Sequence, residues 1–294
     1  MKPILEVKNL IKHYGRVEAV RDVSFSLEEG KCFGLLGPNG AGKTTTIEVI
    51  EDVISPTSGE IFYKQAPRSS SFREEVGIQF QQTALLGYMT IRETLQTFKS
   101  LYQNTAEIDY LAELCFLREF LDQMNDKISG GQRQRFFLAL ALINEPELIF
   151  LDEPSTGLDP QARRNLWDVV NRIKQMGKTI ILTTHYMEEA QYLCDEVAIM
   201  DYGKIIAQGN PNELIRQHGG DVIVELPKAS FQQIPDPQRF SYAEKTDTVE
   251  ISTRDANTCL SDLLSLKVNL NDVIIRSQNL ESVFLNLTGR KLRE

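Results

Sequence analysis

The stretch GPNGAGKTT, residues 37–45, decides the fold of this chain. It fits the pattern G-x-x-x-x-G-K-[ST], with Gly37, Gly42, Lys43 and Thr44 at the fixed positions. Backbone N–H groups of such a loop form a cradle for phosphate oxygens, while its lysine reaches the β- and γ-phosphates and its Thr hydroxyl binds Mg²⁺. The stretch therefore predicts a nucleotide-binding loop made of Gly37, Pro38, Asn39, Gly40, Ala41, Gly42, Lys43, Thr44 and Thr45.

The segments around the loop predict an α/β fold. A short buried strand, KCFGLLG, precedes the loop, and a helix, TTTIEVIEDVI, follows it, which is the context that a phosphate-binding loop requires. Farther along, the strands PELIFLDEP and TIILTT alternate with helical segments, so a largely parallel core sheet is expected. Near the N-terminus, ILEVKNL and VSFSL alternate apolar and polar residues, which predicts an antiparallel β-subdomain.

The sequence also suggests two domains. Residues 1–215 carry the nucleotide-binding pattern, with a helical subdomain at about 85–145 that opens with Thr90 and Glu93 as a capping box. After residue 210 the character changes, since DVIVEL, TVEIS and DVIIR read as strands and CLSDLLSL and LESVFLNL as helices. We therefore expect residues 216–294 to form a small C-terminal α+β accessory domain.

Composition narrows the class of protein. The chain has 294 residues, 41% hydrophobic and 25% charged, with a formal charge of −9 and no dense Lys/Arg run, so nucleic acid is not expected as a partner. Its four cysteines are far apart in sequence and form no C-x-x-C, which predicts isolated buried thiols in a reducing compartment.

The N-terminus and the apolar runs indicate a cytoplasmic chain. MKPILEVKNLIKHYG has no signal-peptide core, because charged residues return every few positions. The longest wholly apolar run is FFLALALI, whereas a membrane span needs about 20 residues. We expect no signal peptide or transmembrane segment, so that any membrane role comes through a partner.

Two further segments carry chemistry. Asp152 and Glu153 directly follow a fully apolar strand, where Asp152 would hold a metal, directly or through water, and Glu153 would polarise an attacking water. In ISGGQRQR, Ser129, Gly130 and Gly131 precede a helix, and free N–H groups at a helix N-terminus form an anion site. The chain thus has a second candidate phosphate-binding element, far in sequence from the first.

Five motifs in this order, GPNGAGKTT, ISGGQ, LIFLDEP, STGLD and TTH, resemble the ATP-binding subunits of ABC transporters over about residues 4–215. The resemblance implies roles for residues at matching positions. Ser129, Gly130, Gly131 and Gln132 form the family signature, with Ile128 in place of leucine. The resemblance implies four further roles. Tyr14 matches the aromatic residue that stacks on adenine, and Gln81, with Gln79 and Gln82 as alternatives, matches the glutamine that senses Mg²⁺ and water. Asp159 matches the D-loop aspartate, and His185 matches the switch histidine.

The resemblance also implies an assembly. Two such domains face each other head to tail, and each ATP lies between Lys43 of one chain and Ser129 of the other. Because one set of motifs is present, the second set comes from an identical chain or a related one. The expected assembly is thus a homodimer or heterodimer with a polytopic membrane permease, at the cytoplasmic face of the inner membrane, with ATP and Mg²⁺ bound.

The C-terminal stretch SQNLESVFLNLTGRKLRE resembles the ending of ATPase subunits in bacterial two-component exporters of the drug-resistance type, often written LEDVFLELTGRELR. Leu280, Val283, Phe284 and Leu287 recur at helical spacing, which favours packing onto the small domain, although a contact across the dimer is open. We therefore expect the ATP-hydrolysing subunit of an exporter. ATP would drive closure of the dimer, and the dimer would open after hydrolysis.

Three alternatives compete with an exporter. An importer ATPase is disfavoured by the C-terminal resemblance. A soluble ABC ATPase of DNA repair or translation usually has a coiled-coil insertion or two cassettes, and this chain has neither a heptad run nor a second cassette. A cassette that binds ATP without hydrolysing it is disfavoured because Glu153 and His185 are both present. The cargo, whether drug, lipid, polysaccharide or ion, stays open.

Overall fold

The computed structural model describes residues 3–80, 87–231, 236 and 239–289, and these divide into two compact units. The division lies between Pro211 and Asn212, at the start of helix α8 (Pro211–His218). The boundary expected after residue 215 falls inside this helix. No helix among the described residues combines the length and apolar character that crossing a membrane requires.

The first unit contains an antiparallel sheet in the order β2-β1-β4-β5. Burial alternates along β2, because one face of the sheet packs on the core and the other meets solvent. The ring of Phe25 on this sheet stacks on Phe33 of the neighbouring sheet, with ring centroids 4.7 Å apart. The strands are β1 (Pro3–Tyr14), β2 (Val17–Glu28), β4 (Ser58–Tyr63) and β5 (Ala66–Pro67).

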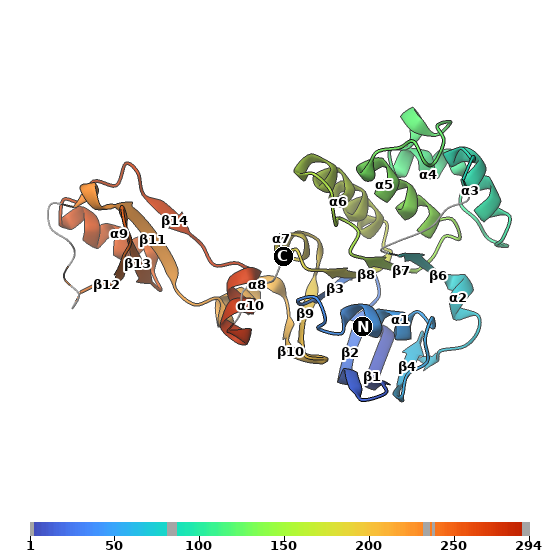
Figure 1. The fold of residues 1–294 in the computed structure, drawn as a ribbon, viewed down its shortest axis with the longest axis horizontal. Helices are drawn as coiled ribbons and strands as arrows, with labels where there is room; N and C mark the ends of the chain where they lie inside the picture. Colours follow the sequence, from blue (N-terminus) through green and yellow to red (C-terminus); the bar gives the residue numbers. More distant parts are fainter. Residues whose placement is uncertain (1–2, 81–86, 232–235, 237–238, 290–294) are drawn as a thin grey trace. The chain divides into compact units, whose positions relative to one another are not determined.

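A six-stranded sheet forms the centre of the first unit, in the order β10-β9-β3-β8-β7-β6 (Figure 1). All neighbours pair in parallel except β9 and β10, which form an antiparallel hairpin with Tyr202 and Gly203 at its turn. Every residue of β3, β7 and β8 is buried. The strands are β3 (Cys32–Leu36), β6 (Val76–Gln79), β7 (Leu148–Asp152), β8 (Thr179–Thr184), β9 (Glu196–Asp201) and β10 (Lys204–Gly209).

Helices complete the first unit. Thr90 begins α3 (Ile91–Lys99) with the predicted capping box to Glu93, and Asp159 is the N-cap of α6 (Pro160–Gln175). The predicted α/β fold with a parallel core sheet, an antiparallel subdomain and a helical part is confirmed. The other helices are α1 (Lys43–Ile50), α2 (Phe72–Glu75), α4 (Ile108–Leu114), η1 (Arg118–Phe120), α5 (Gly130–Ala141) and α7 (Met187–Leu193).

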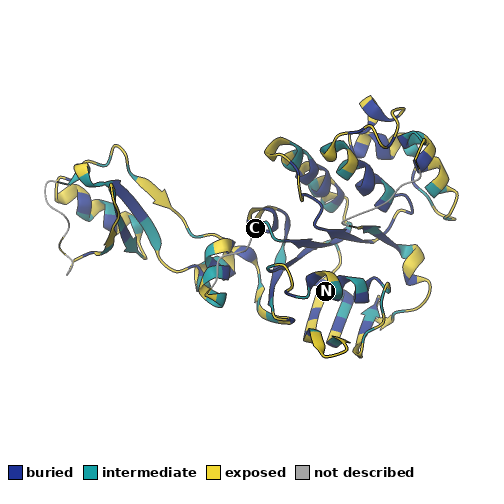
Figure 2. Ribbon diagram, viewed as in Figure 1, coloured by how far each residue is buried: buried dark blue, intermediate teal, exposed yellow. Residues whose placement is uncertain are grey.

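The second unit is an antiparallel sheet with helices. Its order is β12-β13-β11-β14, and β14 is exposed along its length (Figure 2). In helix α10 (Leu280–Thr288), Leu280, Val283 and Phe284 are buried and Leu287 is half-buried, as the helical spacing predicts. The remaining elements are β11 (Val222–Pro227), η2 (Lys228–Ser230), β12 (Ser241–Glu244), β13 (Thr248–Thr253), α9 (Ala256–Ser265) and β14 (Ile274–Arg276).

The cysteines correct one expectation. All four are buried free thiols, as predicted. Two of them are not isolated, since the Sγ atoms of Cys32 and Cys194 lie 3.8 Å apart. Cys32 begins β3 and Cys194 ends α7, and the packing of this helix over the strand brings together residues 162 positions apart.

Candidate functional site

The predicted nucleotide-binding loop connects β3 to α1, and its backbone leaves no room for side chains at two glycines. Gly42 adopts φ +102°, and a Cβ atom there would lie 2.4 Å from the carbonyl oxygen of Ala19. A Cβ at Gly37 would lie 2.4 Å from the carbonyl oxygen of Met200. The strand–loop–helix context that a phosphate cradle requires is therefore present.

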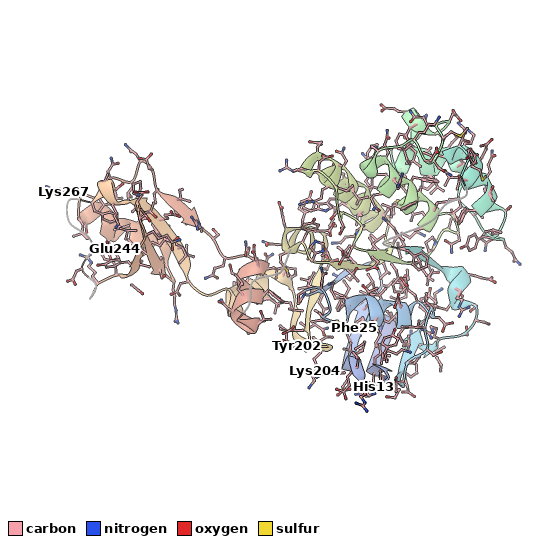
Figure 3. All side chains as sticks on the ribbon, viewed as in Figure 1. His13, Phe25, Tyr202, Lys204, Glu244 and Lys267 are labelled. Carbon is pink, nitrogen blue, oxygen red and sulfur yellow. The ribbon has the colours of Figure 1, made fainter. Side chains whose placement is uncertain are left out.

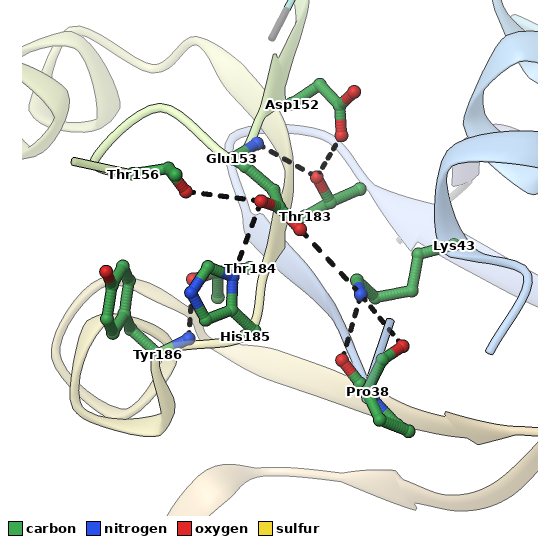
Figure 4. Close-up of polar contacts among 10 residues, drawn as sticks. Pro38, Lys43, Asp152, Glu153, Thr156, Thr183, Thr184, His185 and Tyr186 are labelled. Carbon is green, nitrogen blue, oxygen red and sulfur yellow. Dashed lines mark hydrogen bonds and ion pairs between the residues drawn. The ribbon is translucent and has the colours of Figure 1, made fainter. Parts of the chain in front are cut away.

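Lys43 begins α1 and is almost fully buried, with 4% exposure. Its Nζ donates hydrogen bonds to the carbonyl oxygens of Gly37 at 2.8 Å and Pro38 at 3.3 Å, and lies 3.9 Å from Oε1 of Glu153 (Figure 4). Burial lowers the pKa of Lys43, and the carboxylates of Glu153 and Asp152 oppose that shift. The ammonium is thus held at the loop by acceptor oxygens that a phosphate could replace.

Two acids end β7, beside the end of β8. Oδ1 of Asp152 accepts a hydrogen bond of 2.5 Å from the hydroxyl of Thr183. Burial raises the pKa of Asp152, as does the nearby Glu153, whereas the Thr183 hydrogen bond and Lys43 lower it. Glu153 follows with φ +47°, in the left-handed region that non-glycine residues rarely adopt, and its side chain is 9% exposed. Such a buried acid pair beside a lysine can serve metal binding and proton transfer.

His185 lies directly after β8. Its Nδ1 is 3.4 Å from Oε2 of Glu153, close enough for an ion pair when the imidazole is protonated, although the geometry is not that of a hydrogen bond. The same carboxylate oxygen accepts a hydrogen bond from Thr156 at 3.2 Å. Because parallel strands end at one edge of a sheet, the fold gathers Lys43, Glu153 and His185 there.

A pocket of about 660 Å³ opens over the loop. Tyr14, at the end of β1, lines it and is 48% exposed, and Tyr202 lines it too. Tyr202 lies at the turn between β9 and β10 (Figure 3). Its volume lies in the range of about 300–1,000 Å³ that small-molecule sites have. The predicted residues that line it are Tyr14, Asn39, Gly40, Gly42, Lys43, Thr44, Thr45 and Glu153.

The predicted signature residues are not part of this pocket. Among its described lining residues there is no Ser129, Gly130, Gly131 or Gln132. Ser129 caps α5 by accepting a hydrogen bond from the N–H of Gln132 at 3.3 Å, and Gln132 bonds back to the Ser129 N–H. Asp159 likewise accepts two backbone hydrogen bonds at the start of α6. Within one chain these residues therefore do not line the pocket over the loop.

Gln81 lies outside the described residues. Thr183 was not predicted from the sequence as a site residue, although its hydroxyl donates a hydrogen bond to Asp152 at the end of β7. The available signal was its place in TTH, a hydroxyl at the end of a strand that runs beside the acids.

The donor set fits Mg²⁺. The described residues contain no cluster of three or more His, Cys, Asp or Glu side chains that could hold a metal. Mg²⁺ usually binds through one or two carboxylates and substrate phosphates, keeping several waters, rather than in an all-protein cage. The hydroxyl of Thr44, which lines the pocket, and the carboxylate of Asp152, which is 8% exposed, are oxygen groups of the kind that would hold it.

Comparisons with known proteins identify the family. Residues 20–156 match the family model described as ABC transporter. The linearmycin resistance ATP-binding protein LnrL of Bacillus subtilis is 35% identical, with 99% of this chain and 100% of that protein covered. The Nod factor export ATP-binding protein I of Ralstonia nicotianae is 37% identical, with 99% and 96% covered.

Solved structures agree with the sequence relatives. The structure of cbiO1 from Clostridium perfringens, part of the ABC transporter complex cbiONQ, is 27% identical, with a TM-score of 0.67 over 73% of this chain and 91% of that one. The resemblance inferred from five ordered motifs is thus confirmed. The chain belongs to the ABC transporter family, as an ATP-binding subunit that is an ATPase.

Proposed function

We propose that this chain is the ATP-hydrolysing subunit that powers export by a separately encoded membrane permease. The observation that carries the catalytic part is the meeting of three groups at one edge of the core sheet. Glu153 lies 3.9 Å from the ammonium of Lys43 and 3.4 Å from the imidazole of His185, measured from its two carboxylate oxygens. A cation for phosphate, an acid for water and an imidazole are the groups that phosphoryl transfer to water needs.

In this proposal each group has a defined task. Backbone N–H groups of residues 37–45 and the ammonium of Lys43 bind the phosphates, and the ring of Tyr14 stacks on adenine. Glu153 orients the attacking water and accepts its proton, and His185 contacts the γ-phosphate. Thr44, Asp152 and Gln81 are the residues proposed to hold Mg²⁺, which neutralises charge on the transferred phosphoryl group when bound.

A second chain completes the ATP site in this proposal. Ser129, Gly130, Gly131, Gln132 and Asp159 would come from that chain, because they lie apart from the loop in their own. ATP then stabilises the closed dimer, since it binds that state best, and hydrolysis releases it. The second chain is an identical copy or a related subunit. The dimer sits at the cytoplasmic face of the membrane through its permease.

The direction of transport is inferred from relatives. One is named for linearmycin resistance and another for Nod factor export, and both are matched over nearly their whole length. These names support export and leave the cargo class of this chain unassigned. We further propose that residues 216–294 form an accessory domain, whose removal leaves ATP binding intact and weakens assembly or coupling.

The test is a capture experiment. Tagged Glu153→Gln protein is incubated with detergent-solubilised native membranes and ATP, and the captured proteins are identified by mass spectrometry. The Lys43→Ala variant, which we expect to bind ATP poorly, serves as the matched control. ATP-dependent enrichment of a polytopic membrane protein supports the proposal. Enrichment of a ribosome, a DNA-repair complex or another soluble assembly instead would overturn the transport assignment.

A further inference from the structure

Thr183 binds both acids of the candidate site. It is the residue of β8 that pairs with Asp152 of β7, and it is 1% exposed. Its hydroxyl donates a hydrogen bond to Oδ1 of Asp152 at 2.5 Å and accepts one from the backbone N–H of Glu153 at 3.0 Å (Figure 4). One hydroxyl group therefore links the side chain of the first acid to the main chain of the second.

The link to Asp152 has no substitute nearby. In the part of the chain that the structure describes, the hydroxyl of Thr183 is the one hydrogen-bond donor to this carboxylate. Asp152 is also 8% exposed, so few waters can replace that donor. Without that donor the buried carboxylate would be left unsatisfied, which is costly, and no other donor among the described residues would hold it in place. The orientation of Asp152 thus depends on Thr183.

The link to Glu153 acts on an unusual backbone. Glu153 has φ +47°, and conformations of this kind persist only when the surroundings hold them. Its N–H is bonded to the carbonyl oxygen of Thr183 at 3.1 Å as well as to the hydroxyl. Rotation of this backbone would move the Glu153 carboxylate away from Lys43 and His185.

We propose that Thr183 is a positioning residue for ATP hydrolysis, whose hydroxyl holds the Asp152 carboxylate and the Glu153 backbone where the reaction needs them. The inference rests on the proposed function, since it assigns Thr183 a role through those two acids. Thr183 itself contacts neither the nucleotide nor the water in this account. Its loss should therefore reduce turnover and Mg²⁺ use much more than ATP binding.

The same strand supplies a matched control. Thr179 begins β8 and is 0% exposed, and its hydroxyl accepts a hydrogen bond from the N–H of Gly30 at 3.0 Å. Thr179 and Thr183 are thus buried, hydrogen-bonded threonines at opposite ends of one strand. Replacing either by valine removes a hydroxyl and keeps the shape, so both variants should lose stability to a similar degree.

The experiment measures steady-state ATP hydrolysis and thermal unfolding of the full chain. Thr183→Val should lower kcat about 10- to 100-fold, the loss that small misplacements of catalytic groups produce, with the KM for ATP changed less than about 3-fold. It should also raise the Mg²⁺ concentration that gives half-maximal activity. Thr179→Val should leave kcat within about 2-fold of the unmodified chain while lowering the melting temperature similarly.

A second pair removes the dependence on valine packing. Thr183→Ser and Thr183→Ala differ by the hydroxyl alone, and the serine variant should retain most of the turnover that the alanine variant loses. Equal activity of these two, or equal kcat losses in Thr183→Val and Thr179→Val, would overturn the role of Thr183.

The Glu153→Gln variant distinguishes failure of the proposed function from failure of the role assigned to Thr183. Hydrolysis that survives this change would overturn the proposed site as a whole. If Glu153→Gln loses ATP hydrolysis as expected while the Thr183 variants keep unchanged turnover, the inference about Thr183 alone would be overturned.

Discussion

The two helix N-termini that we propose as anion sites, those of α1 and α5, differ in how they are capped. α1 begins at Lys43 after Gly42, and no side chain caps it. α5 begins after Ser129, whose hydroxyl and whose partner Gln132 form a reciprocal capping box. Lys43 is buried, whereas Ser129 is exposed.

The two helix ends differ in how many backbone N–H groups they leave open for a ligand. At α1 the first N–H groups lack a side-chain acceptor, so a bound phosphate would satisfy donors that the chain leaves open. At α5 the Ser129 cap already accepts from the N–H of Gln132, so the chain itself occupies one of the donors there. The α1 end therefore leaves more of its hydrogen bonding to a ligand, whereas the α5 end has a side-chain cap and is exposed.

The largest expected effect is at the acid beside the α1 end. Glu153→Gln should lower kcat by about 10²- to 10⁴-fold, the range that a general base contributes, with little change in ATP affinity. The variant should accumulate as a dimer when ATP is saturating, as measured by size-exclusion chromatography with light scattering. A monomer under those conditions would contradict the completion of the site by a second chain.

Loss of the lysine tests the α1 end directly. Lys43→Ala should weaken ATP binding about 10- to 100-fold, because one charge-assisted hydrogen bond contributes about 1.5–3 kcal/mol. Isothermal titration calorimetry with ATP measures the change. The control is Lys31→Ala, because Lys31 is an exposed lysine just before the start of β3. This variant should bind ATP normally. Unchanged affinity in Lys43→Ala would remove the loop from its assigned role.

The burial of α1 predicts a pH dependence that α5 lacks. Burial raises the pKa of Glu51, the residue after α1, to about 8, and Asp152 and Glu48 add to the shift. The folded chain therefore holds a proton that the unfolded chain releases near pH 4.5, so this group contributes stability at low pH that is lost as pH rises to about 8.

The Glu51→Gln variant measures that contribution. Its free energy of unfolding, from urea titrations, should fall less between pH 5 and pH 8 than that of the unmodified chain, by about 1–3 kcal/mol. Glu29→Gln, at an exposed glutamate that does not contribute to the shift, is the control. Parallel pH profiles for Glu51→Gln and the unmodified chain would place the Glu51 carboxyl in contact with water.

The smallest expected effect is at the α5 end. Ser129→Ala should cost about 0.5–2 kcal/mol of stability, the usual value of an N-cap, and leave ATP binding to the single chain unchanged. In a Glu153→Gln background it should weaken ATP-dependent dimerisation, measured by sedimentation. Thr90→Ala removes the equivalent capping box of α3, so it should cost similar stability without affecting the dimer. Equal dimerisation in both would leave Ser129 as a cap only.

Local patterns predicted much of this protein. Thr90 was recognisable as a cap because capping depends on residues within three positions of each other. The parallel sheet followed from alternating strands and helices, and the tail helix from its apolar spacing. The contact between Cys32 and Cys194 was not predictable in this way, since no local rule states which buried residues of distant elements meet.

The sequence by itself determined the nucleotide-binding loop, the acids after the apolar strand and the family, because each is a short pattern whose chemistry needs fixed residue types at fixed spacing. Only the tertiary structure decided that Thr183 bonds to both acids, that Glu51 is buried, and that Ser129 lies apart from the pocket. These depend on strand order, register and burial, which arise from the packing of the whole unit.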